Sequence, residues 1–157
     1  MYLPTRISRS VTRGVRGGRG QSLVEFALIL PVLLLLVMGV FDFGRAIFAF
    51  NTVSNAAREG ARTAIVDQSS VSGVPLAATR AADQAIALGL DPSDTADIDV
   101  QYLMPDLGSS CPSRDIGCVA QVRVQYQFVA VTPIIGNILG PITVASTTLI
   151  PIERTNP

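Results

Sequence analysis

Hydrophobic and polar positions divide this chain of 157 residues into very unequal parts. Residues 26–41 are an uncharged run of sixteen, dominated by Leu, Val and Ile, between Glu25 and Asp42. As a helix rising about 1.5 Å per residue, the run spans roughly 24 Å, and apolar neighbours extend it towards the ~30 Å of a hydrocarbon core. The pattern predicts one transmembrane helix over residues 21–45.

Helical spacing continues beyond this run to about Ile65, so residues 46–66 are predicted to extend the same helix as an amphipathic segment. One face combines large and small apolar residues: Phe43, Ile47, Phe50, Ala57, Ala61 and Ala64. The small residues permit close approach of another helix or strand. This face is expected to pack on the chain's own outer domain, on neighbouring subunits, or on both at different depths.

A loop over residues 67–75 and a second helix over residues 76–88 are predicted next, with Gly89 ending the helix. The expected buried side of this helix consists of Ala78, Ala81, Ala82, Ala85 and Ile86. Its small side chains favour close packing against another element.

Alternating hydrophobic and polar residues predict strands at 98–104 and 122–130, and a weaker run predicts a third at 142–150. Proline and glycine interrupt residues 128–142, which excludes a second membrane span there. The expected fold class is α+β, in which residues 67–157 form a small extracytoplasmic domain with a second helix. Its antiparallel sheet of about three strands folds onto the long helix.

Three other interpretations of the apolar run compete with a membrane span. A buried core helix is one, but no other element is apolar enough to surround a helix that is hydrophobic on every side. A cleaved secretory signal is another, although Glu25 opens the run and no small-x-small site closes it. The Arg-rich start also resembles a nucleic-acid-binding arm, but next to a span it is typical of the positive-inside signal.

Charge is segregated along the chain, although the formal net charge is zero. The first twenty residues carry five Arg and no acid, which leaves seven Arg and twelve acids in the remainder. We therefore expect a basic cytoplasmic leader, one span of the cell (inner) membrane and an acidic extracytoplasmic part. A nucleic-acid partner is not expected.

Residues that support catalysis are scarce. The chain has no His, which removes the commonest general base and metal ligand. Neither a Ser-His-Asp arrangement nor a phosphate-binding glycine loop is present, so we predict no enzyme, no cofactor and no small-molecule substrate. One acid run is metal-like: Asp91, Asp94, Asp97 and Asp99. Its spacing is not that of an EF-hand, so turn and cap chemistry is favoured and calcium is a minor alternative.

Cys111 and Cys118 are the chain's two cysteines. Two thiols without His cannot complete a zinc site, and their spacing is not the Cys-x-x-Cys of redox proteins. Because the predicted topology places them outside the cytoplasm, a disulfide joining two strand ends is expected.

The residues around the start of the apolar run resemble a processing site. A basic leader ends at Gly20, Gln21 follows, and Glu25 lies on the fifth residue beyond the glycine. This pattern resembles the class III signal peptides of type IV pilins and pseudopilins. The resemblance implies that a prepilin peptidase cuts after Gly20, on the cytoplasmic side, and leaves the helix attached. The alternative is a flexible glycine leader followed by an interfacial acid.

Downstream motifs make the resemblance more specific. They are Gln21-Ser22-Leu23-Val24-Glu25-Phe26-Ala27, Leu30-Pro31-Val32-Leu33, Gly39, Asp42-Phe43-Gly44-Arg45 and Ala56-Ala57-Arg58-Glu59-Gly60-Ala61-Arg62. Over residues 17–66 the chain resembles the TadE-like family, the pseudopilins of tight-adherence (Flp-type) pilus machinery. A looser echo is the Ser146-Thr147-Thr148 strand that ends near Glu153-Arg154.

The resemblance implies a minor pseudopilin of TadE or TadF type that acts in pilus assembly and surface adhesion. Its implied partners are the prepilin peptidase, other pilins and the inner-membrane platform. Residues with an implied assembly or register role are Glu25, Phe26 and Pro31, and the family block contributes Asp42, Gly44, Arg45, Arg58, Glu59, Gly60 and Arg62. Pro31 lacks a backbone N–H and is expected to kink the span. The alternative is an uncleaved, single-pass accessory or binding protein of the cell envelope.

Overall fold

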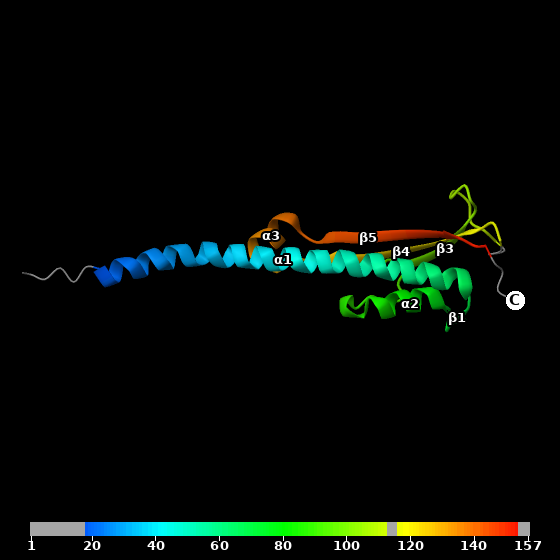
Figure 1. The fold of residues 1–157 in the computed structure, drawn as a ribbon, viewed down its shortest axis with the longest axis horizontal. Coiled ribbons are helices and arrows are strands. Elements are labelled where there is room, and N and C mark those ends of the chain that lie inside the picture. Colours follow the sequence, from blue (N-terminus) through cyan, green and yellow to red (C-terminus); the bar gives the residue numbers. More distant parts are fainter. Residues whose placement is uncertain (1–17, 113–115, 154–157) are drawn as a thin grey trace, which may run out of the picture. The chain divides into compact units, whose positions relative to one another are not determined.

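The computed structural model describes residues 18–112 and 116–153, and its fold is α+β (Figure 1). The elements in chain order are α1 (Gly18–Val66), β1 (Ser70–Val71), β2 (Val74–Pro75), α2 (Leu76–Gln84), the 3-10 helix η1 (Ile86–Leu88), β3 (Ile98–Leu103), β4 (Val119–Phe128), α3 (Pro133–Leu139) and β5 (Ile142–Pro151). The chain divides into two compact units, Met1–Val37 and Met38–Pro157. The predicted leader, 1–20, lies outside the described residues except for its last three.

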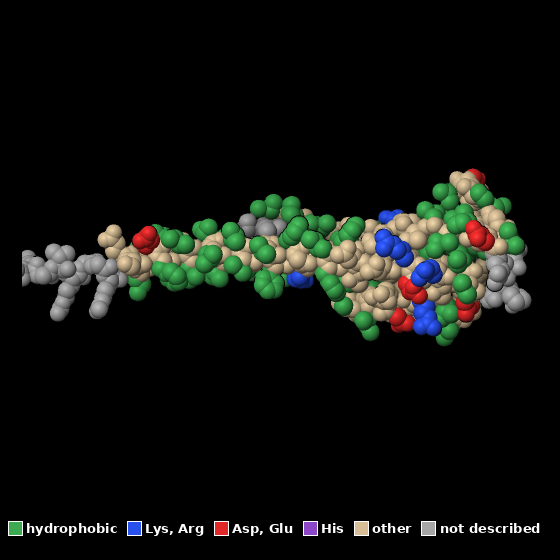
Figure 2. All heavy atoms as spheres, in the orientation of Figure 1, with side chains coloured by type: hydrophobic (Ala, Val, Ile, Leu, Met, Phe, Trp, Pro, Cys, Tyr) green, Lys and Arg blue, Asp and Glu red, His purple; other side chains and the backbone are tan. Residues whose placement is uncertain are grey.

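In the first unit the described residues form the beginning of α1. The most apolar 18-residue window of this helix has a mean hydropathy of 2.7 and no buried residue. Figure 2 shows hydrophobic side chains covering its visible face. By length and composition α1 is able to cross a membrane, which confirms the predicted long apolar helix. The helix stays continuous through Pro31, so the kink remains a prediction.

In the second unit α1, α2 and one face of the sheet pack around a common core (Figure 1). The core is built mainly from small residues: Val53, Ala56, Ala57, Ala61 and Ala64 of α1, Ala77, Ala78, Ala81 and Ala82 of α2, and Ile98, Ala120, Val122 and Val124 of the sheet. Gly60 lies on α1 where it meets both α2 and β4. A Cβ there would be 3.0 Å from Val122 Cγ1 and 3.1 Å from both Ala77 O and Ala81 Cβ.

The sheet is antiparallel in the order β3-β4-β5, which confirms the three predicted strands. In the central strand, β4, Val124 pairs with Ile98 of β3 on one side and with Ser146 of β5 on the other. Along β4, Ala120, Val122 and Val124 are buried, while Arg123 is exposed. Because successive strand residues point to opposite faces, this alternation places one face of the sheet on α1.

The segment predicted to be a loop, residues 67–75, contains a small hairpin. β1 pairs with β2 through Ser70 and Pro75 and through Val71 and Val74. The two turn residues, Ser72 and Gly73, have φ values of 53° and 84°. Two positive φ values match the twist of a two-residue hairpin, and glycine adopts such values without strain.

The predicted core position Ile86 of the second helix proves to be exposed. Ile86 is 79% exposed because α2 ends at Gln84 and η1, with three residues per turn, changes the direction of the side chain. The predicted stop is confirmed, since Gly89 ends η1 with a φ of 67°.

The large residues of the predicted α1 face are also exposed: Phe43, Ile47 and Phe50. Burial on α1 instead begins with Asp42, Ala49 and Val53 and becomes continuous among the later alanines. The alanine part of the predicted face therefore packs on the chain's own domain, whereas the large residues do not, and their packing on neighbouring subunits stays a prediction.

Candidate functional site

Asp42 connects α1 with a segment about ninety residues later in the chain. Its carboxylate accepts hydrogen bonds from the backbone N–H groups of Val131, at 2.9 Å, and Thr132, at 2.8 Å. Arg45 Nη1 lies 3.3 Å from the same carboxylate. Asp42 is only 6% exposed, so these partners take the place of water around a buried charge.

Arg45 also contacts the connection between β4 and α3. Its guanidinium carbon lies 5.4 Å from the centre of the Phe128 ring, and its Nη1 lies 3.5 Å from the carbonyl oxygen of Val129. The i, i+3 spacing places Arg45 on the same helix face as Asp42. Together these contacts form one polar anchor that holds the β4–α3 connection on α1.

Replacing Asp42 with Ala should release this connection. Two N–H groups lose their acceptor, so hydrogen exchange of the Val131 and Thr132 amides should accelerate roughly tenfold to a hundredfold. Amides in the middle of β4 should keep their protection. Asp83→Ala, which removes an exposed acid from α2, is the matched control and should leave all these rates unchanged. Unchanged exchange at Val131 and Thr132 in Asp42→Ala would contradict the anchor.

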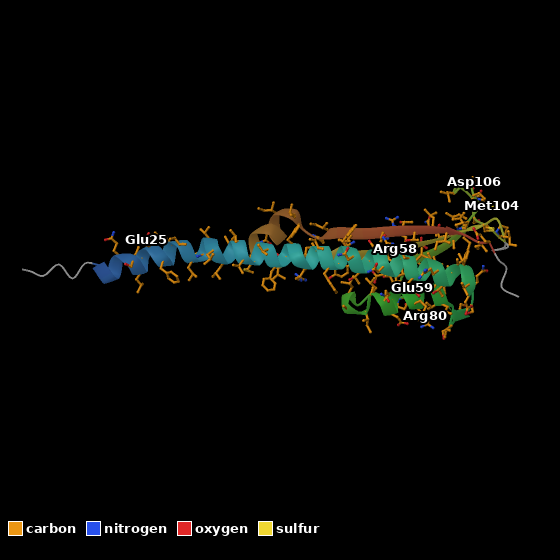
Figure 3. All side chains as sticks on the ribbon, viewed as in Figure 1. Glu25, Arg58, Glu59, Arg80, Met104 and Asp106 are labelled. Atoms are coloured by element: carbon orange, nitrogen blue, oxygen red, sulfur yellow. A yellow bond between two sulfur atoms is a disulfide. The ribbon has the colours of Figure 1, made fainter. Side chains whose placement is uncertain are left out.

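The second half of the family block faces two different environments. Gly60 lies in the core, whereas Arg58, Glu59 and Arg62 line an open hollow of about 480 Å³ with Asn55, Gln84, Thr148 and Ile150. Figure 3 shows Arg58 and Glu59 on α1 and Arg80 on α2. Glu59 and Arg62 do not form an ion pair, since within the described part of the chain only Asp42 and Arg45 come within 4.0 Å as opposite charges.

The predicted processing site lies in the first unit. Gly20, Gln21 and Glu25 line a shallow hollow on α1 together with Val24 and Leu28. Glu25 is exposed and projects away from the helix (Figure 3). It makes no ion pair with any residue that the structure describes. Gly20 and Gln21 are both helical, so a peptidase that cuts an extended backbone must first unwind this turn.

Cys111 and Cys118 form a disulfide, as predicted. Both are buried, and they pack with Ile152 beyond the end of β5. Cys111 N–H donates to Tyr102 O, and Ile152 N–H donates to Cys118 O. The disulfide therefore links the segment after β3 to the residue before β4, at the end of the sheet where β5 also ends.

The acid run forms turns rather than a cluster of ligands. Asp91 accepts hydrogen bonds from the Ser93 hydroxyl and backbone N–H, which lower its pKa below the usual value by favouring the charged form. The Asp94 carboxylate accepts a hydrogen bond from the backbone N–H of Ala96, two residues later. Within residues 18–112 and 116–153, no group of three or more His, Cys, Asp or Glu could hold a metal ion.

Sequence reasoning identified Asp42 and Arg45 as members of a motif but missed their role as a tertiary anchor. The available signal was an acid directly after sixteen uncharged residues, with an arginine three positions later. The partners of Asp42 are backbone N–H groups, which the sequence does not distinguish from those of other residues.

The comparison with family models gives one match, and it lies on the long helix. A model described as TadE-like protein matches residues 20–62. Residues 20–62 are therefore similar to TadE-like protein, and this match covers less than half of the chain. Comparison with curated proteins and with solved structures gives no match. The TadE-like segment holds Gly20, Glu25, Asp42 and Gly60, so one family pattern covers the exposed start of α1, the anchor and the core contact. An apolar N-terminal helix within it is consistent with a pilin-like protein of a Tad system.

Proposed function

We propose that the chain is a minor pseudopilin of a tight-adherence (Flp-type IVb) pilus or secretion system. In this proposal a prepilin peptidase cleaves it after Gly20, and the product acts in pilus assembly and surface adhesion. One observation carries the proposal: within the TadE-like segment, an exposed carboxylate at Glu25 lies on an exposed apolar helix, five residues beyond Gly20.

Glu25 needs a partner from outside the described chain. A carboxylate near the end of a membrane helix is costly unless it is paired or reaches the interface. Cleavage after Gly20 would create a free α-amine on Gln21, and the amine of one subunit could pair with Glu25 of its neighbour. A buried carboxylate left alone costs several kcal/mol, so only one axial register of the subunits would satisfy it.

The local sequence makes the start of α1 easy to unwind for a peptidase. Gly18 and Gly20 lie in the first turn, and glycine leaves the backbone freer to leave the helical conformation than any other residue does. The first turn also lacks an acid to complement the helix dipole. These features support cleavage at Gly20, with the five arginines of the leader keeping that side cytoplasmic.

N-terminal sequencing of the mature protein tests the cleavage. Expressed with a prepilin peptidase and extracted from the membrane, the wild-type chain should begin at Gln21. Gly20→Val should block the cut because its side chain hinders the extended backbone in the active site. Gly18→Val is the matched control and should be processed normally. A wild-type product that begins at Met1 would contradict the proposal and favour the uncleaved envelope protein.

A further inference from the structure

We propose that the connection from β4 through α3 to β5, residues 129–142, lies in the surface of the membrane that α1 crosses. This interfacial segment would bind at the boundary between lipid headgroups and acyl chains. The inference rests on the membrane insertion of α1 in the proposed function, but it does not depend on cleavage or assembly.

The interfacial segment is unusually apolar for a surface connection. Its exposed large side chains are Val129, Val131, Ile138, Leu139 and Ile142. Ile138 is 75% exposed and Leu139 is 60% exposed, both on a helix of seven residues. No charged residue occurs between residues 124 and 152. Exposed apolar surface of this kind marks a site of contact with a membrane or a partner.

The Asp42 anchor places this segment beside the end of the apolar run. Val131 and Thr132 are bonded to the first residue after the sixteen uncharged ones. The surface of α1 there is apolar as well, since Phe41 and Phe43 are 72% and 67% exposed. An open hollow of about 420 Å³ lies on the same part of the helix, lined by Val40, Phe41, Gly44, Arg45 and Phe48. Figure 2 shows hydrophobic side chains over α3, where Figure 1 places it.

The backbone of the segment suits an environment with little water. The N–H groups of Val131 and Thr132 donate to Asp42, and those of Gly136 and Gly140 donate to carbonyl groups one turn earlier. Pro133 has no N–H to satisfy. Since unsatisfied N–H groups are costly next to lipid, internal pairing lowers the cost of moving the segment into the interface.

The charges of the anchor fit the same position. Asp42 is buried and paired, and Arg45 places its guanidinium over Phe128 while 45% of its side chain stays exposed. An arginine with an apolar stem is well suited to the headgroup level, where its charge can reach water or phosphate.

A lipid surface explains the exposed apolar side chains of the interfacial segment better than a second copy of the chain does. The segment is bonded to α1 where the apolar run ends, so every inserted copy would bring it to the interface before any assembly. Lipid also covers the exposed face of α1 and that of α3 together, whatever their shapes. Packing against another copy is therefore the alternative outcome of the test.

Tryptophan fluorescence can test this directly because the chain contains no Trp. Ile138→Trp reports the interfacial segment, and Ile86→Trp, at an equally exposed position of η1, is the matched control. The full chain is reconstituted in phosphatidylcholine–phosphatidylglycerol vesicles with or without brominated acyl chains. Bromine should reduce the emission of the Ile138→Trp variant about twofold or more, with a blue-shifted maximum, and should leave the emission of Ile86→Trp unchanged.

Two further variants make a negative result decisive. Leu139→Trp repeats the test in case Ile138→Trp fails to fold, which loss of the disulfide or of the circular dichroism signal would reveal. Leu33→Trp reports insertion of α1. Quenching of the Leu33→Trp variant without quenching at positions 138 and 139 overturns this inference alone. Failure to quench the Leu33→Trp variant overturns the membrane span and this inference with it.

Protein density separates lipid from a second copy. Quenching of the Ile138→Trp variant by brominated lipid should persist as the chain is diluted in the vesicles. A blue shift that appears only at high density, without quenching, would show that another copy covers the segment and would overturn the inference. A mature chain that begins at Met1 would overturn the proposed pseudopilin while leaving the quenching result intact.

Discussion

Gly60→Val should strongly destabilise the second unit, Met38–Pro157. The first added carbon would lie 3.0 Å from Val122 Cγ1 and 3.1 Å from Ala77 O, before the two methyl groups of Val are counted. The carbonyl oxygen belongs to the backbone of α2 and cannot rotate away. Overpacking in a core costs about 1–3 kcal/mol, and contact with backbone on one side and the sheet on the other places this variant at the upper end.

The conformational effect of removing a glycine works in the opposite direction. Gly in a helix interior is disfavoured by about 1 kcal/mol relative to Ala, so Gly60→Ala gains helix propensity while it meets the same close contacts. These two effects nearly offset each other for Ala, which makes Val the more decisive variant. Its β-branched side chain gains less helix propensity and adds more volume.

Gly44→Val is the matched control for Gly60→Val. It lies on the same helix, but a Cβ there meets nothing within 4 Å. Thermal unfolding of the full chain in detergent, followed by circular dichroism of the sheet, should show a large drop in the midpoint temperature for Gly60→Val. The midpoint for Gly44→Val should stay close to that of the wild type, because the free energy of unfolding should change by no more than about 0.5 kcal/mol. Equal midpoints for the two variants would show that the core does not close around Gly60.

Glu25→Ala should insert in the membrane and be cleaved, yet fail to assemble. The substitution removes the carboxylate that the Gln21 amine of a neighbour is proposed to bind, so no single register is favoured. It leaves the Gly20–Gln21 bond and the apolar run unchanged. Co-purification with the other pilus components should fall by at least about tenfold, the effect of losing one strong charged hydrogen bond.

Asp83→Ala is the control for Glu25→Ala, because it removes an exposed acid from α2 and changes the net charge equally. It should co-purify with pilus components like the wild type. Normal co-purification of Glu25→Ala would refute the register role. Mass spectrometry of the mature wild type adds a separate check, since an N-terminal Gln can cyclise. A pyroglutamate at residue 21 would exclude a pair between a charged amine and Glu25.

The apolar start of the helix and the strands could be predicted from the local order of hydrophobic and polar residues, because that order depends on whether each residue faces lipid, a core or solvent. A run of sixteen uncharged residues has to meet lipid or a core, and alternating residues in β4 have to face a core and solvent in turn. The boundaries followed with small errors, such as the end of β3 at Leu103 rather than Met104. The disulfide followed from the predicted membrane topology, which places both cysteines outside the cytoplasm.

The sequence pattern was insufficient where tertiary contacts decide burial. Phe43, Ile47 and Phe50 have the spacing of a core face, but they are exposed in the fold. A periodic pattern shows which residues share a face, and it does not show what covers that face. The predicted burial of Ile86 was wrong for a different reason, because the change from α2 to η1 turns its side chain out of the core.

By itself the sequence determined the long apolar helix, the α+β class, the strands, the cysteine pair and the TadE-like pattern over residues 20–62. Each of these depends on residues close together in the chain or on a motif of fixed spacing. Only the tertiary structure decided that Asp42 binds Val131 and Thr132 and that Gly60 is enclosed by α2 and the sheet. Those contacts join residues far apart in the chain, through backbone N–H groups at Asp42 and through both backbone and side-chain atoms at Gly60, so no local pattern encodes them.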